Sequence, residues 1–274
     1  MEYGLERCNF MVRQFVVAAL ALSVSRIFAQ TPATSPRANE FEVATIKPVE
    51  SDAKSGRYLI MQGTHRFVGK NYTLQLLIAA AYDLNPRTIS GGPAWIDSEH
   101  FDIQAVTPGE VRPSRPDQMA MLRTLLTDRF KLTFHREQKE FSIYELQLAK
   151  SGSKLKASTA APDEPPALIS TVYPQRILLP ARNATMEDFV SLLQRAVLDR
   201  PVVDKTGLKG RFDFDLEWAP DETQFGGEVP VAPADAKESP FFTAVQEQLG
   251  LKLIATRGPV SALVVDQAER PTAN

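Results

Sequence analysis

The spacing of apolar and polar residues predicts short strands and an amphipathic helix in the first half of the chain. Residues 41–46 alternate apolar and polar side chains, which predicts a strand that Pro48 ends. Residues 66–68 predict a second short strand. The helix predicted next is capped by Asn71 or Thr73, runs to Tyr82 and is apolar at helical spacing. Residues 101–105 then predict another strand.

The second half of the chain repeats this plan. Thr185 opens another apolar helical stretch, and residues 212–216 follow it as a strand. Each half then continues with a further helix and a strand pair that we expect to form a hairpin. The expected hairpins join residues 132–134 to 144–148 and residues 251–254 to 263–265.

A duplicated helix–strand unit specifies an architecture better than a single motif does. The pattern predicts an α+β fold, a tandem pseudo-repeat of two-layer units with short mixed or antiparallel sheets and helices packed on one face. One continuous sheet built by both halves is the alternative.

Composition divides the chain into segments. Residues 157–167 hold three prolines and are typical of a linker, and the long irregular connections at 107–116 and 219–240 occupy the same relative place in each half. We expect a signal peptide, a disordered leader, a first α+β unit, a linker, a second α+β unit and a tail. Their predicted bounds are 1–29, 30–40, 41–156, 157–167, 168–268 and 269–274.

The N-terminus has the features of a secretory signal peptide. Arg7 and Arg13 give it positive charge, residues 15–24 are an uncharged apolar run, and residues 27–29 form a cleavage site. The run is shorter than the roughly 20 apolar residues that span a bilayer. An uncleaved anchor is the alternative. The single cysteine, Cys8, precedes the run, so the exported chain would carry no thiol and no disulfide, which suits a bacterial periplasm or secretion from a bacterium.

Charge and histidine spacing narrow the function classes. The chain has 31 basic and 33 acidic residues without a basic cluster, so we expect no nucleic-acid partner. His65, His100 and His135 form no close-spaced ligand pattern, so we expect no metal and no other cofactor.

Some short motifs match those of known enzymes. Ser51–Lys54 and Ser151–Lys154 match S-x-x-K, and Lys205–Gly207 matches K-T-G, the elements of serine acyl-enzymes that react with penicillin. Both S-x-x-K matches lie in polar loops and no S-D-N element lies between them and Lys205, so chance explains them better. Asp204–Gly207 also matches the phosphorylated motif of ion-pumping ATPases. A turn after a strand explains that match better.

The best candidate for a binding surface follows the first predicted helix. Gly91 and Gly92 permit unusual backbone angles, Trp95 offers apolar area with one donor, and Tyr82 at the helix end borders them. These four residues are the predicted ligand-binding residues. The alternative is that Trp95 belongs to the core, which a similar tryptophan in the second half, Trp218, favours.

Several ordered blocks of the sequence resemble one known family. They include GGPAWI at residues 91–96, LLTDRFKL at 125–132 and PVVDKTGL at 201–208, with further blocks at 41–48, 73–82, 101–103 and 249–253. Over residues 41–268 the chain resembles the "soil-associated protein" family, an exported domain of unknown function with large paralogous sets in some soil bacteria. Some relatives are fused to membrane metallopeptidase sensors of the beta-lactam antirepressor type, which implies an extracytoplasmic sensing part. This chain lacks their H-E-x-x-H motif, so the resemblance implies no catalytic residue.

We therefore expect an exported, non-enzymatic recognition or sensing module that binds an envelope protein or a small ligand, in the periplasm or outside the cell. One alternative is an envelope hydrolase with a dispersed acid–base pair. Asp213 and Asp215 point to one face of a strand and would suit it, although a polar exterior explains them as well. The other alternative is a structural or assembly module of the cell envelope.

Overall fold

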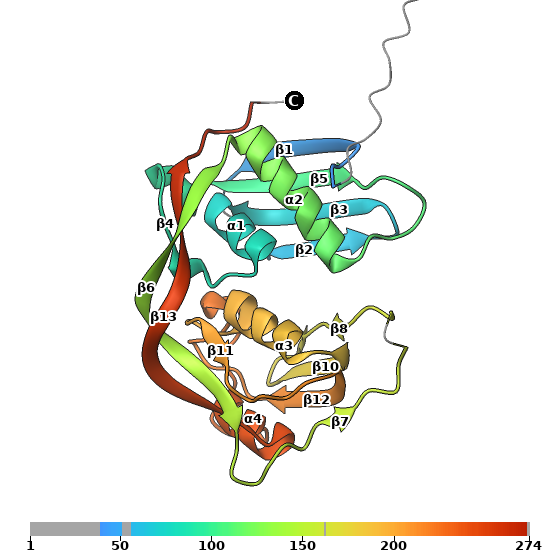
Figure 1. Cartoon of the computed structure of the whole chain (residues 1–274), viewed down its shortest axis with the longest axis vertical. Coiled ribbons are helices and arrows are strands. Elements are labelled where there is room, and N and C mark those ends of the chain that lie inside the picture. Colours follow the sequence, from blue (N-terminus) through green and yellow to red (C-terminus); the bar gives the residue numbers. More distant parts are fainter. Residues whose placement is uncertain (1–38, 51–55, 162, 273–274) are drawn as a thin grey trace, which may run out of the picture. The chain divides into compact units, whose positions relative to one another are not determined.

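The computed structural model describes residues 39–50, 56–161 and 163–272. The predicted signal peptide, most of the predicted leader and the S-x-x-K match at residues 51–54 lie outside the described residues. Within them the chain folds into four α-helices and three β-sheets (Figure 1). This combination confirms the predicted α+β class.

The first sheet is antiparallel, with the strand order β1-β5-β3-β2. Its strands are β1 (Val43–Val49), β2 (Tyr58–Gln62), β3 (Arg66–Thr73) and β5 (His100–Val106). Helices α1 (Leu74–Tyr82) and α2 (Arg115–Phe130) pack against each other, and Figure 1 shows both in front of this sheet. The prediction that Pro48 ends β1 is wrong. An edge strand tolerates a residue without an N–H, so β1 continues to Val49.

A bulge in β3 leads the chain into α1. Asn71 has a left-handed backbone with φ 57°, and its N–H donates to Oδ1 of Asp102 in β5 at 3.0 Å. Thr73 then accepts the N–H of Leu76 and caps the helix. The predicted helix and its Thr73 cap are confirmed.

The second sheet is also antiparallel and has the order β7-β12-β10-β8, with β9 pairing to another part of β10. Its strands are β7 (Lys156–Ala157), β8 (Ala167–Leu168), β9 (Thr171–Val172), β10 (Ile177–Ala184) and β12 (Phe212–Trp218). Helices α3 (Met186–Leu192) and α4 (Phe241–Leu249) belong to this half.

The bulge of β3 has an equivalent in β10. Asn183 has φ 51°, its N–H donates to Oδ1 of Asp213 in β12 at 2.8 Å, and Thr185 caps α3 two residues later. Asp188 completes a capping box with Thr185. The same local arrangement therefore occurs in both halves. A repeat of the whole unit stays a prediction.

A third sheet, with the order β11-β6-β13-β4, takes strands from both halves. Strands β6 (Thr133–Leu148) and β13 (Leu251–Gln267) pair antiparallel over their whole lengths. The short strands β11 (Val202–Asp204) and β4 (Ile89–Gly91) pair parallel to β6 and β13, respectively. Figure 1 shows the two long strands side by side.

The two predicted hairpins are wrong, because β6 and β13 are each one continuous strand. Residues 135–143 hold no glycine, proline or asparagine that would turn the chain. In β13, by contrast, the Gly258–Pro259 pair is a sequence pattern typical of a turn. In the structure they lie opposite Phe141 and Glu140, and a Cβ on Gly258 would come within 2.9 Å of Ile143 Cδ1. The glycine serves close strand packing. The alternative of one continuous sheet holds only for the third sheet, because the first and second sheets each take strands from one half.

Two buried hydrophobic clusters form the cores, and each takes residues from the opposite half of the chain. The first cluster lies between the first sheet and helices α1 and α2, and it also holds Leu263 and Val265 of β13. The second cluster lies around α3, α4 and the second sheet, and it also holds Leu146 of β6. Trp95 lies in the first core and Trp218 in the second. The long β6–β13 pair thus belongs to both cores.

Four further short turns complete the described part of the chain. They are the 3₁₀ turns η2 (Pro86–Thr88), η3 (Ala94–Asp97) and η5 (Phe225–Gly227) and the π-helical turn η4 (Leu193–Val197).

Candidate functional site

Tyr82, the first predicted site residue, ends α1 and is partly buried beneath two arginines. Its ring meets Phe134 of β6 edge-on at 5.0 Å. The guanidinium carbons of Arg123 and Arg136 lie 5.5 and 5.9 Å from the ring centre. Burial raises the pKa of the Tyr82 hydroxyl, and the two arginines act in the opposite direction. Tyr82 therefore serves as a platform for cations of its own chain.

Trp95 lies in η3 and has a different set of neighbours. Its ring stacks on Phe130 at 6.5 Å and meets Phe101 edge-on at 6.2 Å, so only 8% of the residue is exposed. Arg270 covers the ring at 5.2 Å and holds the carboxylate of Glu99 with two nitrogens. The geometry is that of a core residue under a surface ion pair.

Gly91 and Gly92, the remaining predicted residues, lie where β4 leaves the edge of the third sheet. Both have positive φ, 79° and 72°. A Cβ on Gly91 would lie 2.6 Å from the Val265 carbonyl oxygen, and one on Gly92 would lie 2.9 Å from Cγ1 of the same valine. Only glycine permits this approach to β13. The close packing explains the two glycines, and their other side is exposed.

A pocket of about 180 Å³ lies beside these glycines. Buried Ile89 and Ile96 contribute apolar walls, and Gln75, Ser90 and Asp97 contribute polar groups. The other residues that line it are Gly91, Gly92, Pro93 and Ala94. The structure thus brings Gly91 and Gly92 together at one pocket, whereas Tyr82 and Trp95 do not line it.

Part of the β4 backbone is open along this pocket. β4 ends the order of its sheet, with β13 as its only neighbouring strand among the described residues. The Gln75 amide of α1 donates to the Ile89 carbonyl oxygen at 3.4 Å. Ser90, Gly91 and Gly92 are exposed. The edge of a sheet and a small pocket therefore adjoin each other.

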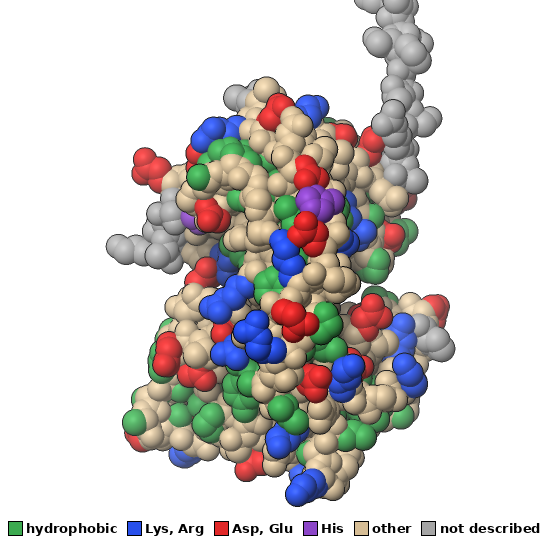
Figure 2. All heavy atoms as spheres, turned by 60° about the vertical axis from the view of Figure 1, so that its left-hand side comes forward, with side chains coloured by type: hydrophobic (Ala, Val, Ile, Leu, Met, Phe, Trp, Pro, Cys, Tyr) green, Lys and Arg blue, Asp and Glu red, His purple; other side chains and the backbone are tan. Residues whose placement is uncertain are grey.

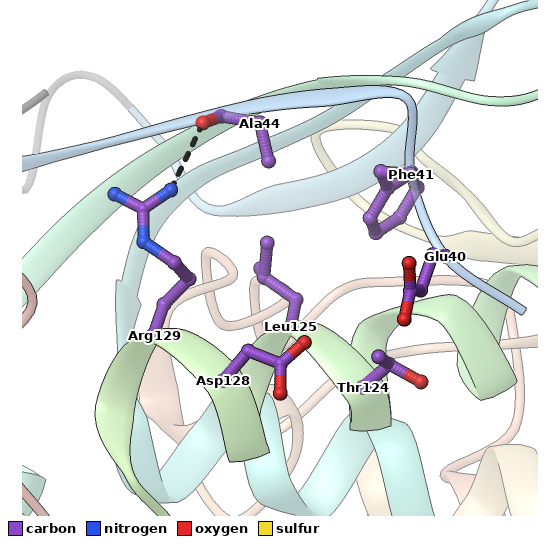
Figure 3. Close-up of a pocket in the computed structure, with 7 residues that line it drawn as sticks. All are labelled: Glu40, Phe41, Ala44, Thr124, Leu125, Asp128 and Arg129. Carbon is purple, nitrogen blue, oxygen red and sulfur yellow. Dashed lines mark hydrogen bonds between the residues drawn. The ribbon is translucent and has the colours of Figure 1, made fainter. Parts of the chain in front are cut away.

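A second pocket, of about 170 Å³, lies between the N-terminal segment and α2 (Figure 3). Figure 3 shows Glu40 pointing toward Thr124, with Leu125 extending from α2 toward Ala44. Arg129 of α2 donates to the carbonyl oxygen of Ala44 in β1 at 3.2 Å and to that of Thr272 near the C-terminus at 3.5 Å. This arrangement fastens β1 and the C-terminal segment to α2.

The candidate acid–base pair has structural partners. Asp213 holds the β10 bulge, and the Asn183 N–H, followed by the Ser158 hydroxyl, lowers its pKa. Asp215 is exposed and pairs with Arg182 at 2.8 Å. A general acid needs a raised pKa, so the lowered pKa of Asp213 does not suit that role.

The enzyme-like motifs form turns. Oδ1 of Asp204 accepts the N–H of Thr206 at 2.8 Å and its hydroxyl at 2.7 Å, and Gly207 follows with φ 68°. The Lys154 amine donates to the Glu247 carbonyl oxygen at 2.6 Å. These contacts agree with the interpretation of both segments as loops.

The histidines lie in separate environments. His135 is exposed, with Nδ1 2.7 Å from Asp266 and Nε2 3.0 Å from Glu137. Glu137 first and Asp266 second raise the pKa of His135. His100 contacts the Ser98 carbonyl oxygen. Within the described part of the chain, no group of three or more His, Cys, Asp or Glu is placed to hold a metal ion.

Sequence reasoning missed a polar junction between the two halves. The buried side chain of Asn85 donates to the carbonyl oxygens of Gln194 at 2.7 Å and Leu198 at 3.2 Å, while Gln194 donates to the Asp83 carbonyl oxygen at 2.6 Å. Ser191 donates to the Asp83 carboxylate at 2.7 Å. Single polar residues between apolar stretches carry no sequence signal for such long-range pairs.

The surface that carries β6 and β13 shows basic and acidic side chains interspersed (Figure 2). This mixture gives no broad field of one sign that would steer a polyanion. Among the described residues, no helix combines the length and the apolar character that a bilayer crossing requires.

Comparisons with known proteins place the chain in a family but assign no activity. No curated protein matches it, and no solved structure matches it. Residues 75–268, more than half of the chain, match a family described as a protein of unknown function, DUF3738. This match covers β4, the pocket beside it and both long strands. The chain belongs to the DUF3738 family.

Proposed function

We propose that this protein is a non-enzymatic recognition module that binds an extended segment of a partner protein along β4 and in the pocket beside it. The observation that carries the proposal is the exposed Ser90–Gly91–Gly92 backbone at a sheet edge, directly beside a pocket of about 180 Å³.

The exposed edge supports binding of an extended segment. An edge strand presents N–H and C=O groups that an added strand can pair with, and peptide-binding domains use this mode. Gly91 and Gly92 lack side chains that would keep an added strand away. The other residues of the pocket would give such a strand its specificity.

The size and chemistry of the pocket support one kind of anchor. Pockets for drug-sized ligands measure about 300–1,000 Å³, so a pocket of about 180 Å³ suits a single side chain. Ile89, Ile96 and Pro93 suit an apolar stem, and Asp97 is the only charged residue of the lining. A lysine or arginine of the partner combines such a stem with a cation that complements Asp97.

Export across the cytoplasmic membrane is part of the proposal. Its support is the positive N-terminus, the apolar run at residues 15–24 and the cleavage site at 27–29. The resemblance to the soil-associated protein family, whose relatives include fusions to membrane sensors, agrees with extracytoplasmic sensing. Cell fractionation and the N-terminal sequence of the purified protein test this part. A cytoplasmic protein that keeps Met1 would contradict it.

Selection from a random peptide library tests the binding mode. We expect the enriched peptides to share one basic residue within a run that favours extended backbone. Titration calorimetry should then show that Asp97→Asn weakens binding about tenfold or more, because it removes a charge-assisted contact. Asp128→Asn, at the other pocket, should leave binding unchanged. Failure to enrich any peptide, or equal effects of the two substitutions, would contradict the proposal.

A further inference from the structure

Three arginines lie near one another and near Tyr72 at the junction of the two halves, one at the ring of Tyr72 and two at Asp83. Arg57 precedes β2, Arg115 is the first residue of α2, and Arg195 lies in the π-helical turn η4. The guanidinium carbon of Arg57 lies 5.6 Å from the centre of the Tyr72 ring. The charges of all three arginines act on the Tyr72 hydroxyl. Segments far apart in the sequence therefore bring three cations into the surroundings of one phenol.

Two carboxylates oppose these three cations. Oδ1 of Asp83 lies 3.2 Å from Nη2 of Arg115 and 3.6 Å from Nε of Arg195, and it also accepts the hydroxyl of Ser191. Glu228 pairs with Arg57 at 3.2 Å. One carboxylate thus serves two guanidinium groups, and the cluster of these five charged residues keeps one positive charge in excess.

Two of the three arginines are buried more deeply than the two carboxylates, whereas the side chain of Arg115 is 42% exposed. The side chains of Arg57 and Arg195 are 20% and 21% exposed, whereas those of Asp83 and Glu228 are 43% and 52% exposed. Solvent therefore screens the carboxylates more than it screens these two arginines. Nε of Arg195 is buried and has no hydrogen-bond partner among the described residues.

Burial first, and then the charge of Arg115, lower the pKa of Arg195 to about 10. Such a shift means that the surroundings oppose the positive charge more than Asp83 favours it. A negatively charged group bound next to Arg195 would stabilise its positive charge. Nε of Arg195 is 3.6 Å from Asp83 and makes no hydrogen bond, so an acceptor at hydrogen-bond distance would stabilise this buried donor.

The backbone fixes Arg195 in this position. The Leu198 N–H donates to the Leu193 carbonyl oxygen at 2.7 Å. This bond spans five residues, as in a π-helix, instead of the four of an α-helix. Asn85 holds the carbonyl oxygens of Gln194 and Leu198. Turns of this kind occur frequently at functional sites. The backbone that carries Arg195 is therefore held in place before any ligand arrives.

We infer that Arg57, Arg115 and Arg195, together with Tyr72, form a binding site for one small oxyanion, a phosphate or a carboxylate group. Guanidinium groups bind both of these through paired hydrogen bonds. Burial raises the pKa of Tyr72, so its hydroxyl stays protonated and able to donate. One bound anion balances the excess charge and supplies an acceptor for Arg195. The site is separate from β4 and does not depend on the proposed peptide binding.

Inorganic phosphate and acetate, each compared with chloride at equal ionic strength, test the site on the purified protein. We expect a saturable rise in Tm with at least one oxyanion, and broadening of the ³¹P resonance if that anion is phosphate. Arg195→Met should weaken binding about tenfold or more. Arg87→Met, which removes a more exposed arginine paired with Asp199, should preserve it.

Two further variants keep the test decisive if Arg195→Met does not fold. Arg195→Lys keeps the charge but loses the forked donor, and Tyr72→Phe loses only the hydroxyl. Either should weaken the oxyanion effect relative to the Arg87→Met protein. A rise in Tm no larger than that with chloride for both anions would overturn the inference. So would equal binding by the wild-type protein and all the variants of the cluster.

Discussion

At the scale of single residues, a close backbone contact sets the shape of the candidate recognition edge. Gly91 and Gly109 have nearly the same left-handed backbone, with φ 79° and 78°. A Cβ on Gly91 would meet the Val265 carbonyl oxygen at 2.6 Å, whereas one on Gly109 would meet no atom within 4 Å. The two glycines therefore separate the cost of the backbone angle from the cost of the contact.

We predict that Gly109→Ala lowers the free energy of unfolding by about 1–2 kcal/mol, the cost of a left-handed non-glycine residue. Gly91→Ala should cost clearly more, because the methyl group also displaces β4 from β13. Urea denaturation of both variants measures the difference. Equal losses would show that the contact with β13 does not constrain the edge.

His135 provides a prediction about pH at the same scale. Glu137 and Asp266 raise its pKa above 6.5, so the folded state binds the proton more tightly than the unfolded state does. The resulting stabilisation is fully present below the unfolded pKa of about 6.5 and is lost as pH rises through the folded pKa. His135→Gln should therefore flatten the fall of the urea midpoint above about pH 6.5. An unchanged slope in the His135 variant would contradict the assignment.

At the scale of elements, the sequence predicted the helix caps correctly but not the long-range pairing of strands. Thr73 caps α1 as the sequence predicted, because a cap acts on the next turn of its own helix. Thr185, predicted only to open a helical stretch, caps α3 in the same way. The predicted hairpins at the end of each half are wrong, because β6 pairs with β13, a strand more than a hundred residues away. The three-residue strand β4 has no strand pattern of its own and exists through its pairing with β13.

The candidate site was only partly predictable for the same reason. The adjacent glycines pointed to Gly91 and Gly92, since two glycines mark an unusual backbone. Gln75 and Asp97 join them only through the fold. Trp95 and Tyr82 have the side chains of a binding surface, yet neighbours from distant segments occupy both.

The junction between α1 and the π-helical turn provides a prediction about stability. The Asn85 amide satisfies two carbonyl oxygens of the turn, and the residue is only 2% exposed. Asn85→Ala should lower the free energy of unfolding by about 1–3 kcal/mol, because buried acceptors lose their donor. Gln267→Ala, which removes an exposed amide near Glu269, should change it by less than about 0.5 kcal/mol. A neutral Asn85→Ala would mean that water replaces the amide.

At the scale of the whole molecule, the long β6–β13 pair makes the two cores depend on each other. Each core contains residues of a strand from the opposite half, so cutting the chain in the segment 157–167 would remove part of both. Trp95 reports on the first core and Trp218 on the second. We predict one cooperative unfolding transition for residues 39–272.

Single-tryptophan variants test this cooperativity. In Trp218→Phe, urea unfolding followed by Trp95 fluorescence should coincide with the far-UV circular dichroism of the same variant. In Trp95→Phe, the fluorescence of Trp218 should likewise coincide with circular dichroism. Separate midpoints for fluorescence and circular dichroism would show that the cores unfold independently.

The most direct test of the proposed function is hydrogen–deuterium exchange of the protein with and without a peptide enriched in the library selection. Strand addition to β4 predicts slower exchange in the segment from Ile89 to Gly92, where the edge backbone gains hydrogen bonds. It also predicts that the amides near Glu40 and Thr124, at the other pocket, exchange as before. Protection elsewhere, with residues 89–92 unchanged, would contradict recognition through this edge.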